Sequence, residues 1–235
     1  RKIVVLNIPD YGENTVAEFA VGLLLMVSRK LYECVKKVQE EGLFSQAGLR
    51  GFDLKGKTIG ILGTGRIGVH MIKMVKGFDM KVIAFDAHPK DNLAQELGFS
   101  YVSFDDLLAQ SDIVSVHLPY MKETHHILNV DNIAKMKKGS VLINTARGAL
   151  VETEALVKGL REGILLGVGL DVLEEEGFVE DETRLLFSAH PNEASLKTTL
   201  ANHYLIEHPR AIIAPHNAFN TEEAIKRILD TTVEN

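Results

Sequence analysis

The stretch Thr58–Gly68, which reads TIGILGTGRIG, decides the fold of this chain. Its opening residues are mostly apolar and predict a buried strand, and a predicted helix begins at Ile67, directly after a glycine-rich turn. Gly63, Gly65 and Gly68 have the GxGxxG spacing that is typical of dinucleotide binding between a strand and a helix. The first glycine allows a tight turn, the second lets the backbone approach a pyrophosphate, and the third lets the helix pack on the strand.

A second predicted strand, at 81–86, ends in Asp86. A carboxylate about 20 residues after the glycine motif can accept hydrogen bonds from both ribose hydroxyls of NAD and repels the 2′-phosphate of NADP. The sequence therefore predicts NAD as the cofactor. Two alternatives stay open: NADP, because Lys90 is near enough to help hold a phosphate, and a plain tight turn with Asp86 as a solvated strand end.

Strand-like and helix-like segments alternate along the rest of the chain. Each predicted strand is almost wholly apolar, which is typical of a parallel sheet covered on both faces. We therefore predict an α/β fold, a doubly wound parallel sheet of the Rossmann type. The further strands are expected at 112–117, 140–145, 166–171 and 211–215, and the helices at 14 to about 40, 67–75, 103–111, 152–162 and 221–235. Residues 3–8 predict a short buried strand or strand end, and 174–209 receive no assignment.

Composition narrows the class of protein. The 235 residues are 46% hydrophobic and 25% charged, which is ordinary for a soluble globular protein. A net charge of −6 argues against a nucleic-acid partner. No apolar run approaches the length of a membrane span. The single cysteine, Cys34, excludes an internal disulfide and favours a reducing, cytoplasmic location.

Five motifs then indicate a family. TIGILGTGRIG, VHLPYMKETHHIL, INTARGALVETEAL, GVGLDVLEEEG and APHNAFNTEEA follow one another in the order typical of D-isomer-specific 2-hydroxyacid dehydrogenases. The chain resembles that family from about Asn14 to Asn235. The segments PDYGENTVAEFAVGLLL and AGLRGFDLKGKTIGILGTGRIG are most similar to its D-lactate dehydrogenase branch.

The resemblance implies a division of the chain. Residues 1–13 would be a strand end and hinge from a substrate domain, 14–215 the dinucleotide-binding domain with a dimerisation helix, and 216–235 the return hinge and helix. The substrate domain itself is expected to be absent or truncated, so we expect the chain to be part of a longer protein. A homodimer through the nucleotide-binding domain is also expected, because 14–40 carry more apolar surface than one sheet face needs.

Three residues match the family's catalytic set: Arg147, Glu176 and His216. An arginine offers a planar fork of donors to the carboxylate of a 2-oxo acid. A histidine can give a proton to the ketone oxygen, and an adjacent carboxylate orients it and favours its protonated form. The plainer alternatives are a surface ion pair for Arg147, a solvated loop for the glutamate run 174–176, and a helix cap for His216.

The resemblance also implies contacts with the cofactor. The backbone N–H groups of Arg66 and Ile67 are expected at the pyrophosphate, and Asp171 is expected to accept a hydrogen bond from the nicotinamide carboxamide. For Asp171 a strand-end cap is the alternative. The remaining contacts are expected near the adenosine ribose, from His117, Leu118, Pro119 and Thr124, and at the nicotinamide, from Thr145 and Ala146.

These residues imply NAD-dependent interconversion of a small 2-oxo acid and its D-2-hydroxy acid, with pyruvate and D-lactate as the best single pair. A glyoxylate/hydroxypyruvate reductase, a phosphoglycerate dehydrogenase and an NAD-sensing corepressor scaffold remain alternatives. No metal is expected, because the spacing of the histidines matches no common metal site. These histidines are His125, His126, His190, His203 and His208.

Overall fold

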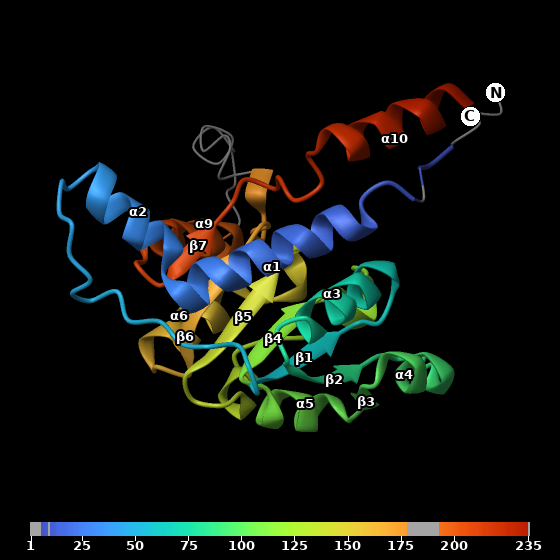
Figure 1. The fold of residues 1–235 in the computed structure, drawn as a ribbon, viewed down its shortest axis with the longest axis horizontal. Coiled ribbons are helices and arrows are strands. Elements are labelled where there is room, and N and C mark those ends of the chain that lie inside the picture. Colours follow the sequence, from blue (N-terminus) through green and yellow to red (C-terminus); the bar gives the residue numbers. More distant parts are fainter. Residues whose placement is uncertain (1–5, 9, 178–192, 235) are drawn as a thin grey trace.

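The computed structural model describes residues 6–8, 10–177 and 193–234, and a parallel sheet forms its centre (Figure 1). In the described residues the sheet has seven strands in the order β3-β2-β1-β4-β5-β6-β7. The order reverses between β1 and β4, which makes that crevice the expected ligand site of an open α/β sheet. The strands are β1 (Thr58–Leu62), β2 (Lys81–Phe85), β3 (Ser100–Tyr101), β4 (Ile113–Val116), β5 (Ser140–Asn144), β6 (Leu165–Leu170) and β7 (Ala211–Ile213).

Helices cover both faces of this sheet and create two hydrophobic cores. One core joins Leu24 of α1 and Ile72 of α3, and the other joins Leu107 of α5 and Leu160 of α6. The α-helices are α1 (Glu13–Arg29), α2 (Leu31–Gln39), α3 (Arg66–Lys76), α4 (Asp91–Leu97), α5 (Phe104–Gln110), α6 (Thr153–Arg161), α9 (Glu193–Glu207) and α10 (Glu222–Glu234). Single 3₁₀ turns are η1 (Lys122–Thr124), η2 (Ile133–Lys135) and η3 (Gly148–Leu150). The predicted doubly wound α/β fold is confirmed.

The predicted helix from 14 to about 40 is wrong in one respect, because it is two helices. The chain breaks at Lys30, which adopts a left-handed conformation with φ +51° and caps α1 by donating its N–H to Met26. Helix α1 buries one face against the sheet, whereas α2 has no buried residue. The apolar spacing continues across the break, so the sequence pattern does not reveal it.

Two other expectations change. Residues 3–5 lie outside the described residues, and 6–8 have no regular structure, with Leu6 exposed, so the buried strand is not found there. The stretch left without assignment contains α9, whose buried face is mainly polar, with Ser195, Thr199 and Asn202 beside Leu205, while Leu200 is exposed. This pattern is the reverse of an ordinary amphipathic helix, so hydrophobic periodicity could not predict it.

The segments at the two ends of the described chain meet. Arg227 of α10 donates through Nε to the Tyr11 carbonyl at 2.8 Å and through a terminal nitrogen to the Thr15 hydroxyl at 3.2 Å. The rings of Tyr11 and Phe219 lie edge to face, 6.5 Å apart. Beyond these contacts α10 stands away from the sheet (Figure 1). The boundaries of the expected hinges stay a prediction.

Candidate active site

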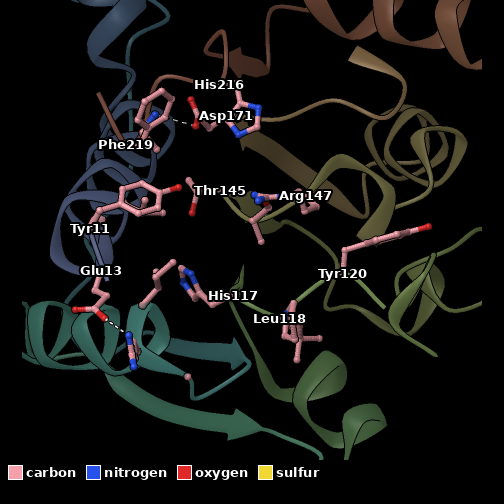
Figure 2. A pocket seen from close by; sticks show the side chains of 18 of the residues that line it. Tyr11, Glu13, His117, Leu118, Tyr120, Thr145, Arg147, Asp171, His216 and Phe219 are labelled. Carbon is pink, nitrogen blue, oxygen red and sulfur yellow. Dashed lines mark hydrogen bonds and ion pairs between the residues drawn. The ribbon is translucent and has the colours of Figure 1, made fainter. Parts of the chain in front are cut away.

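A cavity of about 930 Å³ opens at the carboxyl ends of the central strands (Figure 2). The segments that follow β1, β4, β5 and β6 line one side, and the start of α1 with the 216–219 segment lines the other. Eleven of the sequence-predicted site residues line this cavity: Gly65, Arg66, Ile67, His117, Leu118, Pro119, Thr145, Ala146, Arg147, Asp171 and His216. Parallel strands end at one edge, so residues distant in sequence meet there.

The glycine motif fits a bound dinucleotide. Gly63 has φ +96°, and a Cβ there would lie 2.7 Å from the His117 carbonyl oxygen. A Cβ at Gly68 would overlap the carbonyl of Gly63, so only glycine lets α3 pack this closely. Gly65, in contrast, lines the cavity, and a Cβ there would meet no heavy atom of the described chain within 4 Å. The space beside Gly65 can therefore take a phosphate at the start of α3.

Two buried polar atoms of cavity-lining residues have no partner among the described residues: His117 Nδ1 and Thr145 Oγ1. Buried polar atoms normally form hydrogen bonds, so both are available to a polar ligand. His117 Nε2 lies 2.8 Å from the hydroxyl of Ser115. Burial lowers the pKa of His117 to about 4, so its ring is neutral at pH 7 and Nδ1 can accept or donate one hydrogen bond.

Asp86 lies at the end of β2, beside the glycine turn. One carboxylate oxygen accepts from the N–H and hydroxyl of Thr64, at 2.7 and 2.9 Å, and the other from the N–H of His88 at 2.9 Å. Burial would raise the pKa of Asp86, but these hydrogen bonds outweigh it and the pKa is lowered. Asp86 is therefore charged at neutral pH, half-buried, and held against the turn that Gly63 begins.

Arg66 lines the cavity and also forms ion pairs, whereas Thr124 lies behind the cavity wall. The Arg66 guanidinium pairs with Asp10 and with Glu13, at 3.0 Å in the latter case, and Arg66 is the first residue of α3. Thr124 does not line the cavity. Its buried hydroxyl donates to the Pro119 carbonyl at 2.7 Å and accepts from the N–H of Met121, so it holds the loop that forms part of the wall.

Arg147 follows β5, and Asn144 shapes the turn that carries it. The Asn144 side chain donates to the Arg147 carbonyl and accepts from the Ala146 N–H, both at 3.0 Å. The guanidinium lies on the cavity wall, where one nitrogen donates to the Ala146 carbonyl at 2.6 Å. Its other donors can meet a carboxylate.

His216 and Glu176 form the pair that the sequence predicts. His216 Nδ1 lies 2.8 Å from Glu176 Oε1, and both side chains are about two-fifths exposed, at 42% and 41%. His216 has φ +51°, and its N–H donates to the Asp171 carbonyl at 2.8 Å. Because Nδ1 faces the carboxylate, Nε2 is the atom left to act on a ligand.

Asp171 holds the same loop from β6. Its two carboxylate oxygens accept from the N–H groups of Asn217 and Ala218, at 2.8 and 2.9 Å. Burial raises its pKa, against the lowering effect of these bonds. This geometry matches the strand-end cap considered above, and because the residue also lines the cavity it leaves the expected nicotinamide contact as a prediction.

The three adjacent glutamates have separate partners. Glu174 contacts His126 and Thr153, Glu175 accepts from the Ser195 hydroxyl at 2.9 Å, and Glu176 meets His216. Of the three, Glu176 is the one positioned to act on the histidine. The plainer alternative, a solvated run of charges, does not describe them.

The structure adds cavity residues that motif spacing does not single out. Tyr120 and Phe219 line it and gave no signal beyond their aromatic character, whereas the sequence offered Tyr11 either as a pocket residue or as a turn-packing tyrosine, and it lines the cavity. In the described ranges no group of three or more metal-binding side chains occurs, and His190 lies outside those ranges. Across the part of the chain that the structure covers, no helix has the length and apolar character to cross a membrane.

Comparison with known proteins identifies the family. Residues 21–218 match the family model described as D-isomer specific 2-hydroxyacid dehydrogenase, NAD binding domain. A 2-hydroxyacid dehydrogenase A of Aspergillus oryzae is 40% identical, with 98% of this chain and 63% of the relative covered. D-lactate dehydrogenase of Escherichia coli is 35% identical, with 98% of this chain and 67% of the relative covered.

Solved structures are similar over the same extent. The pyruvate reductase of Chlamydomonas reinhardtii has a TM-score of 0.88 and 38% identity, covering 99% of this chain and 68% of that one. D-lactate dehydrogenase of Aquifex aeolicus, complexed with NAD and lactic acid, has a TM-score of 0.85 and 34% identity. The match covers 97% of this chain and 66% of that one. The chain spans about two thirds of the length of these relatives, 63% to 68%. It belongs to the D-isomer specific 2-hydroxyacid dehydrogenase family and contains that family's NAD binding domain.

Proposed function

We propose that the protein reduces a small 2-oxo acid to the D-2-hydroxy acid with NADH, and reverses the reaction with NAD, with pyruvate and D-lactate as the preferred pair. The contact of 2.8 Å between His216 Nδ1 and Glu176 Oε1, at the cavity that Arg147 also lines, is the observation that carries this proposal. The names of the relatives from Escherichia coli and Chlamydomonas reinhardtii support the choice of substrate.

Each residue has a distinct role in the proposed reaction. Arg147 binds the substrate carboxylate through two parallel N–H donors and holds the ketone in place. His216 gives the proton on Nε2 to the ketone oxygen, and Glu176 stabilises the protonated ring from the other side. The hydride for the carbonyl carbon would come from NADH when it is bound in this cavity. In the oxidative direction His216 begins neutral and takes the proton from the alcohol.

The cofactor contacts follow from the same cavity. Gly63, Gly65 and Gly68, with the N–H groups of Arg66 and Ile67, are proposed to hold the pyrophosphate, and Asp86 the adenosine ribose. The unpartnered atoms His117 Nδ1 and Thr145 Oγ1 are proposed to bond to the ribose and nicotinamide portions, with Leu118, Pro119 and Ala146 as apolar wall and Asp171 at the carboxamide.

A screen of 2-oxo acids tests the proposal. The complete gene product is mixed with NADH and, in turn, pyruvate, glyoxylate, hydroxypyruvate, phosphohydroxypyruvate or phenylpyruvate, and loss of NADH absorbance is followed. Pyruvate is expected to give the highest kcat/KM, and His216→Ala should lower kcat by about 10²- to 10⁴-fold while NADH still binds. Preference for another acid would correct the substrate, and turnover of none, with NADH bound, would refute the enzymatic proposal and favour a scaffold.

Assembly, domain division and location complete the proposal. Leu31, Tyr32 and Val35 of α2 are exposed, which supports a homodimer through this region. Sedimentation equilibrium of the complete protein should give twice the chain mass, and a monomer at tens of micromolar would refute the homodimer.

We keep 1–13 and 216–235 as hinges around 14–215, because Arg227 ties α10 to Tyr11. The single cysteine supports a reducing cytoplasm.

A further inference from the structure

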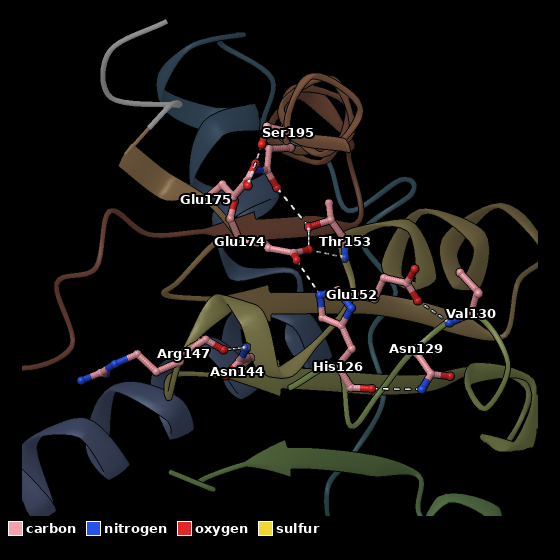
Figure 3. A network of polar contacts seen from close by, with 11 residues as sticks. His126, Asn129, Val130, Asn144, Arg147, Glu152, Thr153, Glu174, Glu175 and Ser195 are labelled. Atoms are coloured by element: carbon pink, nitrogen blue, oxygen red, sulfur yellow. Dashed lines mark hydrogen bonds and ion pairs between the residues drawn. The ribbon is translucent and has the colours of Figure 1, made fainter. Parts of the chain in front are cut away.

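Glu174 is the most enclosed of the three adjacent glutamates, and it does not touch the cavity. Its side chain is 12% exposed, and Oε1 lies 2.5 Å from His126 Nε2 (Figure 3). Oε2 accepts from both the N–H and the hydroxyl of Thr153, at 3.1 and 3.0 Å. Thr153 begins α6, so the carboxylate also lies at the positive end of that helix. Both carboxylate oxygens of Glu174 are thus engaged by groups of the protein itself.

The backbone beside Glu174 is held as tightly as its side chain. Asn202 of α9 donates to the Glu174 carbonyl at 2.7 Å. The N–H of Leu173 points at Glu176 Oε2 at 3.4 Å, so the two turns of chain on either side of Glu174 are linked. The residue therefore joins four segments: the loop at His126, α6, α9, and the turn that carries the catalytic glutamate.

The turn that carries Arg147 packs against the backbone next to Glu174. A Cβ at Gly148 would overlap the carbonyl of Leu173, so the two backbones are in direct contact. The N–H of His126 also donates to the Ala149 carbonyl at 2.9 Å. A shift of the 173–176 turn must therefore move both the carboxylate beside His216 and the turn beside Arg147.

We infer that Glu174 is a positioning residue for the reaction, which holds Glu176 on His216 and supports the turn of Arg147 without contacting substrate or cofactor. This inference rests on the proposed function. Misplacement of catalytic groups by about 1 Å costs up to about 100-fold in rate. Loss of the Glu174 carboxylate should therefore act on kcat and on the KM for the 2-oxo acid, while the cofactor cradle at Gly63 is untouched.

Three variants of the complete protein test this role. Glu174→Ala is expected to lower kcat by about 10- to 100-fold and to raise the KM for pyruvate, with the Kd for NADH unchanged. Glu174→Gln should restore most of the activity, because its amide oxygen can accept from Thr153 and its amide nitrogen can donate to His126. Glu175→Ala is the matched control, since it removes the same atoms one residue away, and should stay near the parent.

A second measurement separates positioning from loss of stability. In a Glu176→Gln background, Glu174→Ala should lower kcat by clearly fewer fold than it does in the parent, because only its effect through the Arg147 turn remains. Any of three results would overturn the inference. Glu174→Ala could lower kcat by as many fold in the Glu176→Gln background as in the parent. Glu174→Ala could have the same kcat as the parent, or Glu175→Ala could lose as much kcat as Glu174→Ala. Should Glu174→Ala fail to fold, His126→Ala replaces it, with a smaller loss of kcat expected, and parent kcat in His126→Ala would overturn the inference as well.

Crystal structures of the same variants give a readout that does not need turnover. The contact between His216 Nδ1 and Glu176 Oε1 should be present in the parent and Glu175→Ala, and broken in Glu174→Ala. If the parent reduces no 2-oxo acid, the proposed function fails while this contact still decides the role of Glu174. An intact contact in Glu174→Ala would refute the positioning role even in an active enzyme.

Discussion

Acid should destabilise this protein partly through His117, a buried histidine of the cavity wall. Burial lowers its pKa from 6.5 to about 4 in the folded chain. As the pH falls below 6.5 the unfolded chain gains a proton at this site, whereas the folded chain does not until about pH 4. The unfolded state then binds more protons, so the free energy of unfolding falls with falling pH.

The size of this effect follows from the two pKa values. At about 1.36 kcal/mol for each pH unit, the gap between 6.5 and about 4 removes about 3 kcal/mol of stability between pH 7 and pH 4. That is a large share of the total for a domain, whose stability is typically about 5–15 kcal/mol. The stabilisation is complete above pH 6.5 and is lost as the pH falls toward the folded pKa.

Urea unfolding of the parent and of His117→Asn, from pH 7 down to about pH 4, measures the effect. The variant starts from lower stability, because it loses buried packing, but it should lose about 3 kcal/mol less than the parent over this range. Carboxylates titrate equally in both proteins, so their contribution cancels. Equal pH dependence in His117→Asn and the parent would refute the reasoning.

The remaining predictions concern the proposed cofactor and substrate contacts. Asp86→Ala should raise the affinity for NADP relative to NAD by about 10-fold or more, measured by fluorescence titration, and an unchanged ratio would contradict the role of Asp86. His216→Ala should lower kcat by about 10²- to 10⁴-fold with NADH affinity unchanged, since only the general acid is lost. Arg147→Lys should raise the KM for the 2-oxo acid more than it lowers kcat, because an ammonium lacks the planar fork. Gly68→Ala should cost about 1–3 kcal/mol in urea unfolding, because its Cβ would overlap the carbonyl of Gly63 and the backbone must move.

The central sheet could be predicted from the sequence because its strands are buried on both faces. Val114 and Ile143, for example, are fully buried in neighbouring strands, so continuous apolar runs mark the central strands β1, β4, β5 and β6. The two-residue strand at Ser100–Tyr101 is too short to produce such a run. The break at Lys30 was missed for a different reason: α2 keeps the apolar spacing of α1 but turns that face to solvent.

The candidate site was predictable in its residue types and less so in its contacts. Motif order placed Arg147 and His216 at the carboxyl edge, and the structure has both on one cavity. Spacing alone could not show that Thr124 holds a loop instead of lining that cavity, because its role depends on where its hydroxyl points. Nor could it separate Glu174 from Glu176, since identical neighbours have identical local patterns.

Backbone conformation is what separates the adjacent glutamates. Three residues around the site have positive φ: His126 at +49°, Glu175 at +52° and His216 at +51°. Such a conformation costs a non-glycine residue about 1–3 kcal/mol and persists where surrounding contacts determine it. Two of the three make side-chain contacts with the neighbouring glutamates, His126 with Glu174 and His216 with Glu176. The left-handed turn at Glu175 sends the side chains before and after it in different directions, so one carboxylate can hold the scaffold while the other meets the histidine. The local strain and the division of roles therefore have the same origin, and neither is visible in a run of three identical letters.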